Sequence, residues 1–366
     1  MPSIYFTIAN LRGRLQAAVP RRRRRLRARL CGSADDWLVV AHGSEPRGNF
    51  LCNPFTSATL PLPHQCTITR SSFLFQDGRR AGWVQYYPRR QHEPEPRVRK
   101  SVLSCAPSSV DDPGKCVVAA IVDSGELFFA RPGQRCWRRP RTRDGSSSRF
   151  HDKVDDVVFH NGMLYAVATL NFHGDTMRVF AVDEDANELV ASRVDGGFMK
   201  KLPDYRSDVP QQYEPGLERR YFVESRGRLL MVERYYFRYR NDVRRTHLFK
   251  VFRRTPMMVE PYRSPIEPWM PLEGLDGEVL FLGGGGSRSF AASEFGGDDA
   301  DCIYFTDDHY PGEEYDLLDN LIHMPCHDIG RFCMRDKSVT FLNLEELPSN
   351  ERRSPPTWLY LSDRRS

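Results

Sequence analysis

Residues 154–167 read VDDVVFHNGMLYAV, and residues 219–232 read RRYFVESRGRLLMV. In each stretch a two-residue turn joins two runs of β-branched, aromatic and aliphatic residues. The turn is Asn161-Gly162 in the first stretch and Arg226-Gly227 in the second. Asn-Gly between apolar runs is the strongest short-range signal for a β-hairpin, because both turn positions need a positive φ. The two stretches therefore predict two antiparallel hairpins whose apolar residues form strand core.

The same design recurs along most of the chain. Further strands are predicted at 37–41, 49–53, 73–75, 82–87, 116–122, 126–130, 136–138, 176–182, 188–194, 246–253, 278–282, 287–292, 302–306, 327–334, 338–342 and 358–361. The Pro-rich stretches 87–99 and 256–271 are predicted loops. Hairpins repeated every roughly 40 to 45 residues predict an all-β fold, a β-propeller of six or seven four-stranded blades over residues 36–361. Trp37, Trp137 and Trp358 are expected to pack between blades.

Composition fits a globular protein with a core. The chain has 366 residues, of which 40% are hydrophobic and 11% are aromatic. No run reaches the roughly 18 apolar residues of a membrane span, and the first 30 residues lack the apolar region of a secretory signal. The nine cysteines are odd in number and include no C-x2-C pair. We therefore expect free thiols in a reducing compartment and no membrane segment.

The positive charge is concentrated at the N-terminus. The formal net charge is +5, but residues 1–34 hold nine Arg, no Lys and no acidic residue, which leaves residues 35–366 at 5 − 9 = −4. We therefore expect a basic, acid-free tail at 1–34, and no nucleic-acid binding by the folded body. The tail has four readings: a solvated arm without an address, a nuclear import signal, a mitochondrial or plastid presequence, and a phosphate-binding arm. The expected location is the cytoplasm or nucleus, with the mitochondrion or plastid as the alternative.

Two short motifs raise the possibility of catalysis or phosphate binding. The GGGG run at 283–286 follows an apolar run, as a phosphate-cradling loop would, but no Gly-Lys-Ser/Thr follows it. We interpret it as a flexible blade loop. Asp155 and Asp156 precede an apolar run and could suggest paired acids. Since Asp side chains commonly accept hydrogen bonds from turn amides, we expect them to cap a turn.

Three further groups contain residue types that bind metals or perform catalysis: His323, Cys326, His327 and Cys333; Asp307, Asp308, His309, Glu313, Glu314 and Asp316; and Ser146, Ser147 and Ser148. The first group has the spacing H-x2-C-H-x5-C, which matches no common zinc pattern. The second is expected to be an acidic loop at the rim of a blade. The third lacks a nucleophile-elbow motif and an evident base. The sequence therefore predicts no catalytic, cofactor or metal site, and a protein that is not an enzyme.

A set of short motifs is spread along the chain: 159–167 (FHNGMLYAV), 221–232 (YFVESRGRLLMV), 249–252 (FKVF), 302–308 (CIYFTDD), Asp36-Trp37, 53–56 (NPFT), 60–63 (LPLP), Arg131-Pro132-Gly133 with Trp137, and Asp328-Ile329-Gly330 with Phe332. Together they resemble the plant KIB-type β-propeller family, also catalogued as domain of unknown function 295 and often attached to an F-box. These segments are collinear over roughly 36–345. The resemblance implies a propeller that recruits substrates to a cullin-type ubiquitin ligase when an F-box precedes it.

An F-box consists of leucine-rich helices that open with Leu-Pro, and residues 1–34 show neither feature. We therefore expect a non-catalytic protein-interaction propeller that resembles the substrate-recognition modules of F-box adaptors, without a Skp-type adaptor as partner. The alternatives are an organelle-targeted propeller of the same family with an unknown ligand or stress-related role, and a truncated gene model. Because propellers bind partners through loops, the expected contact segments are 88–100, 138–148 and 256–271. The basic clusters at 138–143 and 238–245 are expected to be solvated.

Overall fold

The computed structural model describes residues 3–5, 28–42, 48–68, 70–76, 79–87, 96–107, 115–142, 153–170, 174–183, 188–192, 214–215, 219–238, 244–254, 269–295, 299–306, 328–341 and 358–361. Their secondary structure consists of β-strands and two short 3-10 helices, η1 (Gln65–Thr67) and η3 (Ala292–Phe295). The predicted all-β class is confirmed. Within the described ranges, no helix has the length and hydropathy needed to cross a membrane.

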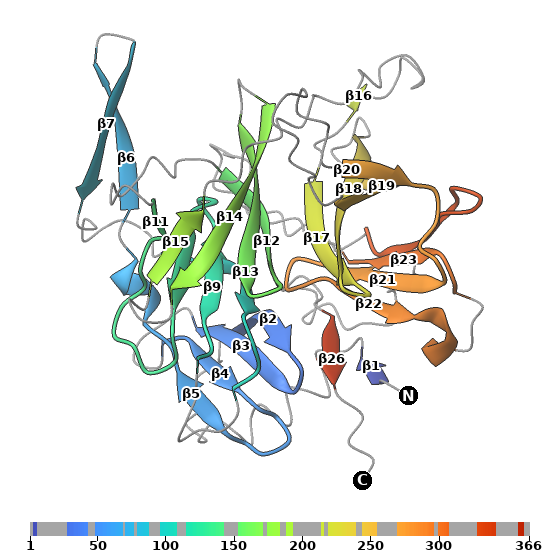
Figure 1. The fold of residues 1–366 in the computed structure, drawn as a ribbon, viewed down its shortest axis with the longest axis horizontal. Coiled ribbons are helices and arrows are strands. Elements are labelled where there is room, and N and C mark those ends of the chain that lie inside the picture. Colours follow the sequence, from blue (N-terminus) through green and yellow to red (C-terminus); the bar gives the residue numbers. More distant parts are fainter. Residues whose placement is uncertain are drawn as a thin grey trace, which may run out of the picture.

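Five sheets of three or more strands surround a common axis (Figure 1). The first sheet contains β2 (Ala28–Ala34), β3 (Trp37–His42), β4 (Phe50–Cys52) and β5 (Thr59–Pro61), and the second contains β8 (Val98–Leu103), β9 (Val118–Val122) and β10 (Leu127–Ala130). The third contains β12 (Lys153–His160), β13 (Met163–Leu170), β14 (Gly174–Asp183) and β15 (Glu188–Ser192), with β11 (Arg141–Thr142) parallel to β15 at its edge.

The fourth sheet contains β17 (Arg219–Ser225), β18 (Arg228–Arg238), β19 (Arg244–Arg254) and β20 (Trp269–Leu272), and β16 (Glu214–Pro215) also pairs with β18. The fifth has the order β22 (Arg288–Ala291), β21 (Glu278–Leu282), β23 (Cys302–Phe305), β24 (Gly330–Cys333) and β25 (Val339–Phe341). Two strand pairs stand apart: β6 (Arg70–Gln76) with β7 (Arg79–Tyr87), and β1 (Ser3–Tyr5) with β26 (Leu359–Leu361).

The sheets contact one another in chain order. The inner strands β2 and β8 are in contact, as are β8 and β12, β12 and β17, and β17 and β22. Asp35, in the turn between β2 and β3, lies 3.4 Å from the guanidinium of Arg288 in the fifth sheet, which returns the ring to its start. The pair β1–β26 lies at the same junction, because β26 contacts β2 (Figure 1). The described residues thus form a closed succession of sheets.

The fourth sheet buries both of its faces against its neighbours. On β18, Leu230 and Val232 belong to the core shared with the fifth sheet, whereas Leu229 and Met231 belong to the core shared with the third sheet. Side chains alternate between the two faces of a strand, so a strand packed on both faces needs a continuous apolar run. This explains the apolar halves of the quoted stretches.

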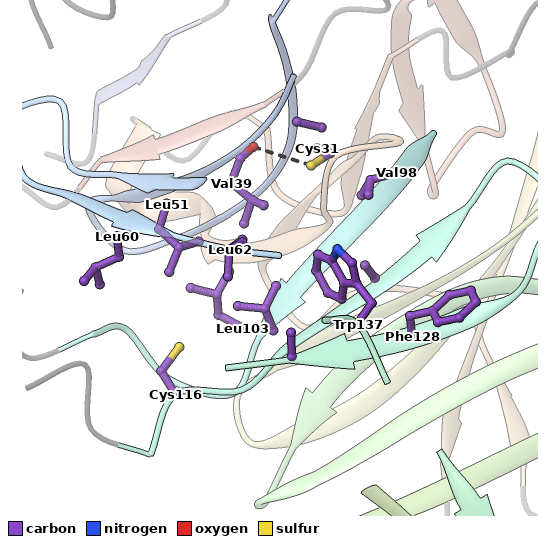
Figure 2. Close-up of a cluster of buried hydrophobic side chains, with 14 of the residues drawn as sticks. Cys31, Val39, Leu51, Leu60, Leu62, Val98, Leu103, Cys116, Phe128 and Trp137 are labelled. Carbon is purple, nitrogen blue, oxygen red and sulfur yellow. Dashed lines mark hydrogen bonds between the residues drawn. The ribbon is translucent and has the colours of Figure 1, made fainter. Parts of the chain in front are cut away.

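The core between the first two sheets is shown in Figure 2, where Leu51, Leu60 and Val39 meet Val98, Phe128 and Trp137. Trp37 belongs to the same cluster. The prediction that Trp37 and Trp137 pack between blades is therefore confirmed, since the cluster combines residues of both sheets. Trp358 is also buried and contacts the edge of Phe281 in the fifth sheet at a ring-centroid distance of 5.1 Å.

The two hairpins predicted from the quoted stretches are present as β12–β13 and β17–β18. Their turn residues have the positive φ values that the sequence demands: 49° at Asn161, 74° at Gly162, 50° at Arg226 and 70° at Gly227. The predicted four-stranded unit from 154 to 194 is also present as β12–β13–β14–β15.

The sequence predicted no strand at the positions of β1, β2, β5, β8, β11, β16 and β20. β2 lies inside the predicted tail of 1–34, so the first sheet begins before residue 36. β8 begins inside the predicted loop 87–99, and β20 occupies the end of 256–271. The described residues contain five sheets in the ring. The predicted total of six or seven blades and the division into tail and propeller stay predictions, because the described residues are only part of the chain.

Candidate functional site

Buried charged side chains lie where the inner strands of the second, third and fourth sheets meet. Lys100 on β8 forms an ion pair with Asp156 on β12, and both side chains are almost fully buried. Asp156 Oδ2 also accepts a hydrogen bond of 2.7 Å from the backbone N–H of Phe222 on β17. Its Oδ1 accepts another, of 2.8 Å, from Val157 N–H. One carboxylate therefore connects three consecutive sheets.

Local irregularities in two strands create this arrangement. The register shifts between Val154 and Asp156 on β12, and between Val98 and Lys100 on β8. A β-bulge re-aims a side chain and leaves backbone groups unpaired. Arg99 uses such groups, because its Nη2 donates to the carbonyl oxygens of Val154 (2.8 Å) and Asp155 (3.1 Å). The bulges thus direct the positive charges of β8 onto β12.

The prediction that Asp156 caps a turn is wrong: the nearby amide that it binds, Val157 N–H, lies inside strand β12. Its carboxylate bonds to the backbone of the neighbouring sheet and to a lysine, both far away in sequence. Asp155 is half-buried, and its backbone carbonyl is what Arg99 binds. Because donors from three strands hold the Asp156 carboxylate, we interpret it as an anchor of the ring rather than as one of two catalytic acids.

A second buried network joins the fourth and fifth sheets around Arg234 on β18, whose side chain is fully buried. Its Nη2 donates to Asp328 Oδ2 at 3.1 Å, and its Nε donates to Thr246 Oγ1 at 2.8 Å. Its Nη1 donates to Tyr221 Oη and to the carbonyl oxygen of Thr306. The guanidinium also lies 4.6 Å from the ring centroid of Phe305.

The network explains why Asp328-Ile329-Gly330 forms a motif. The Asp328 carboxylate accepts hydrogen bonds from Arg234, from the N–H of Thr246 and from the hydroxyl of Thr246. Ile329 is fully buried. A Cβ on Gly330 would lie 2.4 Å from the carbonyl oxygen of Thr340 and 2.9 Å from Phe305 Cζ. Only glycine fits this approach, because Cβ contacts under 3.0 Å force a neighbour to move.

The segment Arg131-Pro132-Gly133 with Trp137 attaches the second sheet to the first. Gly133 N–H donates to the carbonyl oxygen of Pro61 at 2.8 Å, and Trp137 Nε1–H donates to that of Pro63 at 2.9 Å. Gly133 has a φ of 82°, which favours glycine. Two of the recognised motifs, the LPLP segment and the RPG…W segment, therefore bind each other, which their separation in sequence conceals.

The glycine run at 283–286 has a packing role at its first residue. A Cβ on Gly283 would lie 2.6 Å from Thr306 Oγ1 and 3.2 Å from Trp358 Cδ1. Trp358 Nε1–H donates to the carbonyl oxygen of Leu282 at 2.8 Å. The run begins where the C-terminal tryptophan contacts the fifth sheet, and a turn bond joins Gly286 N–H to the Gly283 carbonyl.

Most of the other candidate residues lie outside the described ranges. These are Ser146, Ser147, Ser148, Asp307, Asp308, His309, Glu313, Glu314, Asp316, His323, Cys326 and His327. Cys333 is described and partly buried on β24. In the part of the chain that the structure describes, no group of three or more His, Cys, Asp or Glu side chains has an arrangement that could hold a metal ion.

The three predicted contact segments are described only in part. In 88–100, Arg97 is exposed, whereas Val98, Arg99 and Lys100 are buried in β8. In 138–148, Arg138 is exposed.

Arg139 is half-buried, and its Nη2 donates to Glu126 Oε1 at 2.8 Å. In 256–271, Trp269 is buried, and Met270 is 48% exposed on the edge strand β20. The expectation that these segments are loops is therefore wrong where β8 and β20 begin, and their role in binding stays a prediction.

Comparison with known proteins identifies the family. No curated protein matches the chain significantly. The model of the KIB1-4 β-propeller family matches residues 8–333, which is most of the chain. This match begins within the predicted tail, in agreement with β2 belonging to the first sheet. The chain belongs to the KIB1-4 β-propeller family.

Proposed function

We propose that this protein is a non-catalytic protein-interaction propeller, similar to the substrate-recognition modules of F-box ubiquitin ligase adaptors. One observation supports the proposal above all: the buried charged side chains of the described residues hold the ring together. Lys100 and Asp156 connect three sheets, and Arg234 and Asp328 connect two. Arg220 and Glu233 form a buried pair between β17 and β18.

Such bonds make a rigid platform. Removing one partner of a buried ion pair leaves an uncompensated charge. The Lys100–Asp156 and Arg234–Asp328 pairs therefore resist displacement of one sheet relative to the next, and the Arg220–Glu233 pair stabilises the fourth sheet itself. Rigid scaffolds commonly carry their binding residues on the loops at their rims, where sequence changes disturb the core least. We therefore place partner recognition on the exposed parts of the three contact segments.

Met270 and Arg138 offer the sharpest test of this placement. Met270 is a large apolar side chain exposed on an edge strand, and Arg138 is exposed beside the second sheet. Phe55 is a matched control, because it is 44% exposed but lies outside the three segments. The full chain would be used as bait in affinity capture with quantitative mass spectrometry, alongside Met270→Asp, Arg138→Glu and Phe55→Asp.

We expect a specific protein partner that Met270→Asp or Arg138→Glu loses and Phe55→Asp retains. A Skp-type adaptor among the partners would support a ligase module, and its absence would leave the propeller alone as the binding unit. Recovery of no partner, together with hydrolysis of a small molecule by the pure protein that Asp308→Ala abolishes, would contradict the proposal.

The second candidate is an organelle-targeted propeller with a bound ligand, which the nine Arg and absent acids of residues 1–34 favour. The structure supplies a limit for such targeting. Cleavage at residue 34 would remove β2, whose Cys31 is fully buried in the core between the first two sheets. An import signal that is cleaved must therefore end before Ala28.

Imaging of a C-terminal fluorescent fusion and N-terminal sequencing of the mature protein test this candidate together. Organellar signal with a mature N-terminus before residue 28 is the expected result for import. Fluorescence confined to the cytosol and nucleus would exclude it.

A further inference from the structure

Cys302 and Cys333 lie directly opposite each other on the antiparallel strands β23 and β24. The N–H groups of both residues bond elsewhere: Cys302 N–H donates to Asp299 O, and Cys333 N–H donates to Ser338 O. The neighbouring Met334 N–H donates to Asp301 O at 2.9 Å. This pattern identifies the cysteines as a non-hydrogen-bonded pair.

That register brings the two thiols together. Directly opposed residues in a non-hydrogen-bonded pair have Cα atoms about 4.5 Å apart, and their side chains lie on the same face of the sheet. A disulfide accepts Cα separations of about 4.4–6.8 Å. The strands therefore hold the two Cα atoms at a separation that a disulfide can bridge without unpairing the sheet.

The two thiols differ in access. Cys302 is fully buried, whereas Cys333 is partly exposed. Burial raises the pKa of the Cys302 thiol, so this thiol is the less reactive of the two toward an oxidant in solution. Cys333 is the thiol that a small oxidant reaches first, and Cys302 is placed to attack it from inside the sheet.

We propose that Cys302 and Cys333 form a redox modification site, which peroxide converts into a cross-strand disulfide that staples β23 to β24. In the first step, the Cys333 sulfur attacks one peroxide oxygen, the O–O bond breaks, and a sulfenic acid and one water form. In the second step, the Cys302 sulfur attacks the sulfenic sulfur, and its proton leaves with the hydroxyl group as a second water. Two thiols are oxidised and one peroxide is reduced.

The bond would close a covalent loop around residues 303–332. Closing a loop of this length restricts the unfolded chain, and the fifth sheet contributes to the core shared with the fourth. We therefore expect oxidation to raise the thermal unfolding midpoint by about 5 °C, a shift that addition of dithiothreitol reverses.

The test treats the reduced full chain with hydrogen peroxide, alkylates the remaining thiols and maps the peptides without reduction. Chymotrypsin is the suitable protease, because cleavage after Tyr304 or Phe305 separates Cys302 from Cys326. Cys333→Ser removes the solvent-accessible partner, and Cys136→Ser is the matched control, since Cys136 is exposed beside the second sheet.

We expect a Cys302–Cys333 peptide pair, lighter by two hydrogen atoms, together with the rise in the unfolding midpoint. Both should be absent from Cys333→Ser and retained in Cys136→Ser. Three results would overturn the proposal: free Cys302 and Cys333 when Cys136 is fully oxidised, Cys302 bonded to Cys326 instead, or a Cys302–Cys333 bond without a change in the midpoint.

Discussion

Arg234 is fully buried, yet each of the three nitrogens of its guanidinium donates a hydrogen bond. Its three nitrogens donate to oxygens on β17 and β19, to the carbonyl oxygen of Thr306 after β23, and to Asp328 before β24. Burial of a charge is tolerated only where its partners replace the lost water. At this scale the ring is held by a few charged residues whose partners are remote in sequence.

Asp328→Ala should therefore be among the most damaging substitutions in the fifth sheet. It leaves Arg234 buried without its counter-charge, for which we expect a loss of about 3–5 kcal/mol in the free energy of unfolding. Lys337→Ala is the control, because its pair with Glu273 is exposed and should contribute less than about 1 kcal/mol. Denaturant unfolding followed by tryptophan fluorescence measures both.

A double variant sharpens this prediction. Arg234→Met with Asp328→Leu removes both charges, so its cost should be smaller than the sum of the two single costs. Simple additivity would show that Arg234 and Asp328 do not act as a pair.

Thiol chemistry at Cys52 and Cys116 gives a second residue-scale prediction. Burial raises the pKa of each thiol to about 12, from 9.0. The folded state thus favours the neutral thiol. The contribution of these two thiols to the free energy of unfolding is fully present below about pH 9 and is lost as the pH rises toward about 12, because the unfolded thiols ionise first. At pH 8, iodoacetamide should label the exposed Cys136 quickly, and Cys52 and Cys116 only after unfolding.

Peptide mass spectrometry after timed labelling measures the three rates. Equal labelling of Cys52 and Cys136 in the native protein would contradict the burial of Cys52 in the first sheet. A free energy of unfolding that does not fall between pH 9 and pH 12 would contradict the sign of the pKa shifts.

At the scale of elements, neighbouring sheets are joined by segments that lie outside the strands. The loop after β10 places Trp137 in the core between the first two sheets (Figure 2). Its indole N–H donates to the carbonyl oxygen of Pro63. The LPLP segment (60–63) therefore connects the first sheet to the second, because its carbonyl oxygens accept hydrogen bonds from Gly133 and Trp137.

Trp137→Ala should cost about 3–5 kcal/mol in unfolding free energy, since it leaves a cavity between two sheets. Trp137→Phe keeps most of the packing and loses the hydrogen bond, for which we expect about 1–2 kcal/mol. Thermal or denaturant unfolding of the two variants separates packing from hydrogen bonding. Equal costs for both would show that the Pro63 hydrogen bond, and not the packing, dominates.

The strand pairs that the sequence predicted correctly are those with a local signal. Asn161-Gly162 and Arg226-Gly227 specify their hairpins through backbone conformation alone, and both adopt the expected positive φ. β8, which the sequence did not predict, contains charged residues whose partners lie far along the chain. Arg99 and Lys100 look solvent-exposed in sequence, but bulges on two strands turn them toward β12.

The roles of single residues were harder to predict for the same reason. Asp156 was expected to bind amides of its own turn, but its carboxylate binds Phe222 N–H, sixty-six residues away. The close approaches at Gly330 and Gly283 also depend on neighbours from other segments of the chain. Local sequence specifies hairpins here, whereas contacts between sheets require the three-dimensional arrangement.

At the scale of the whole molecule, the N-terminal strands complete the ring. β2 supplies the inner strand of the first sheet, and β1 pairs with β26 at the junction with the fifth sheet. Asp35 and Arg288 connect the same two sheets. Residues near the two ends of the chain therefore meet where the succession of sheets closes.

Two truncations should behave differently. A chain that starts at Ala28 keeps β2 and should unfold cooperatively. A chain that starts at Asp36 loses β2, leaving the apolar edge of β3 and the inner strand β8 without their neighbour, and it should aggregate or lose its cooperative transition. Size-exclusion chromatography and thermal unfolding compare the two. Equal behaviour would show that β2 is dispensable for the ring.

A crystal structure of the full chain, at a resolution that shows side chains, is the most direct test of the closed ring. The predicted result is a set of sheets around one axis, with Asp156 between Lys100 and the Phe222 amide, and with the Trp358 indole donating to Leu282 O. Two sheets stacked face to face, with Asp156 remote from Phe222 and no axis between them, would contradict the account.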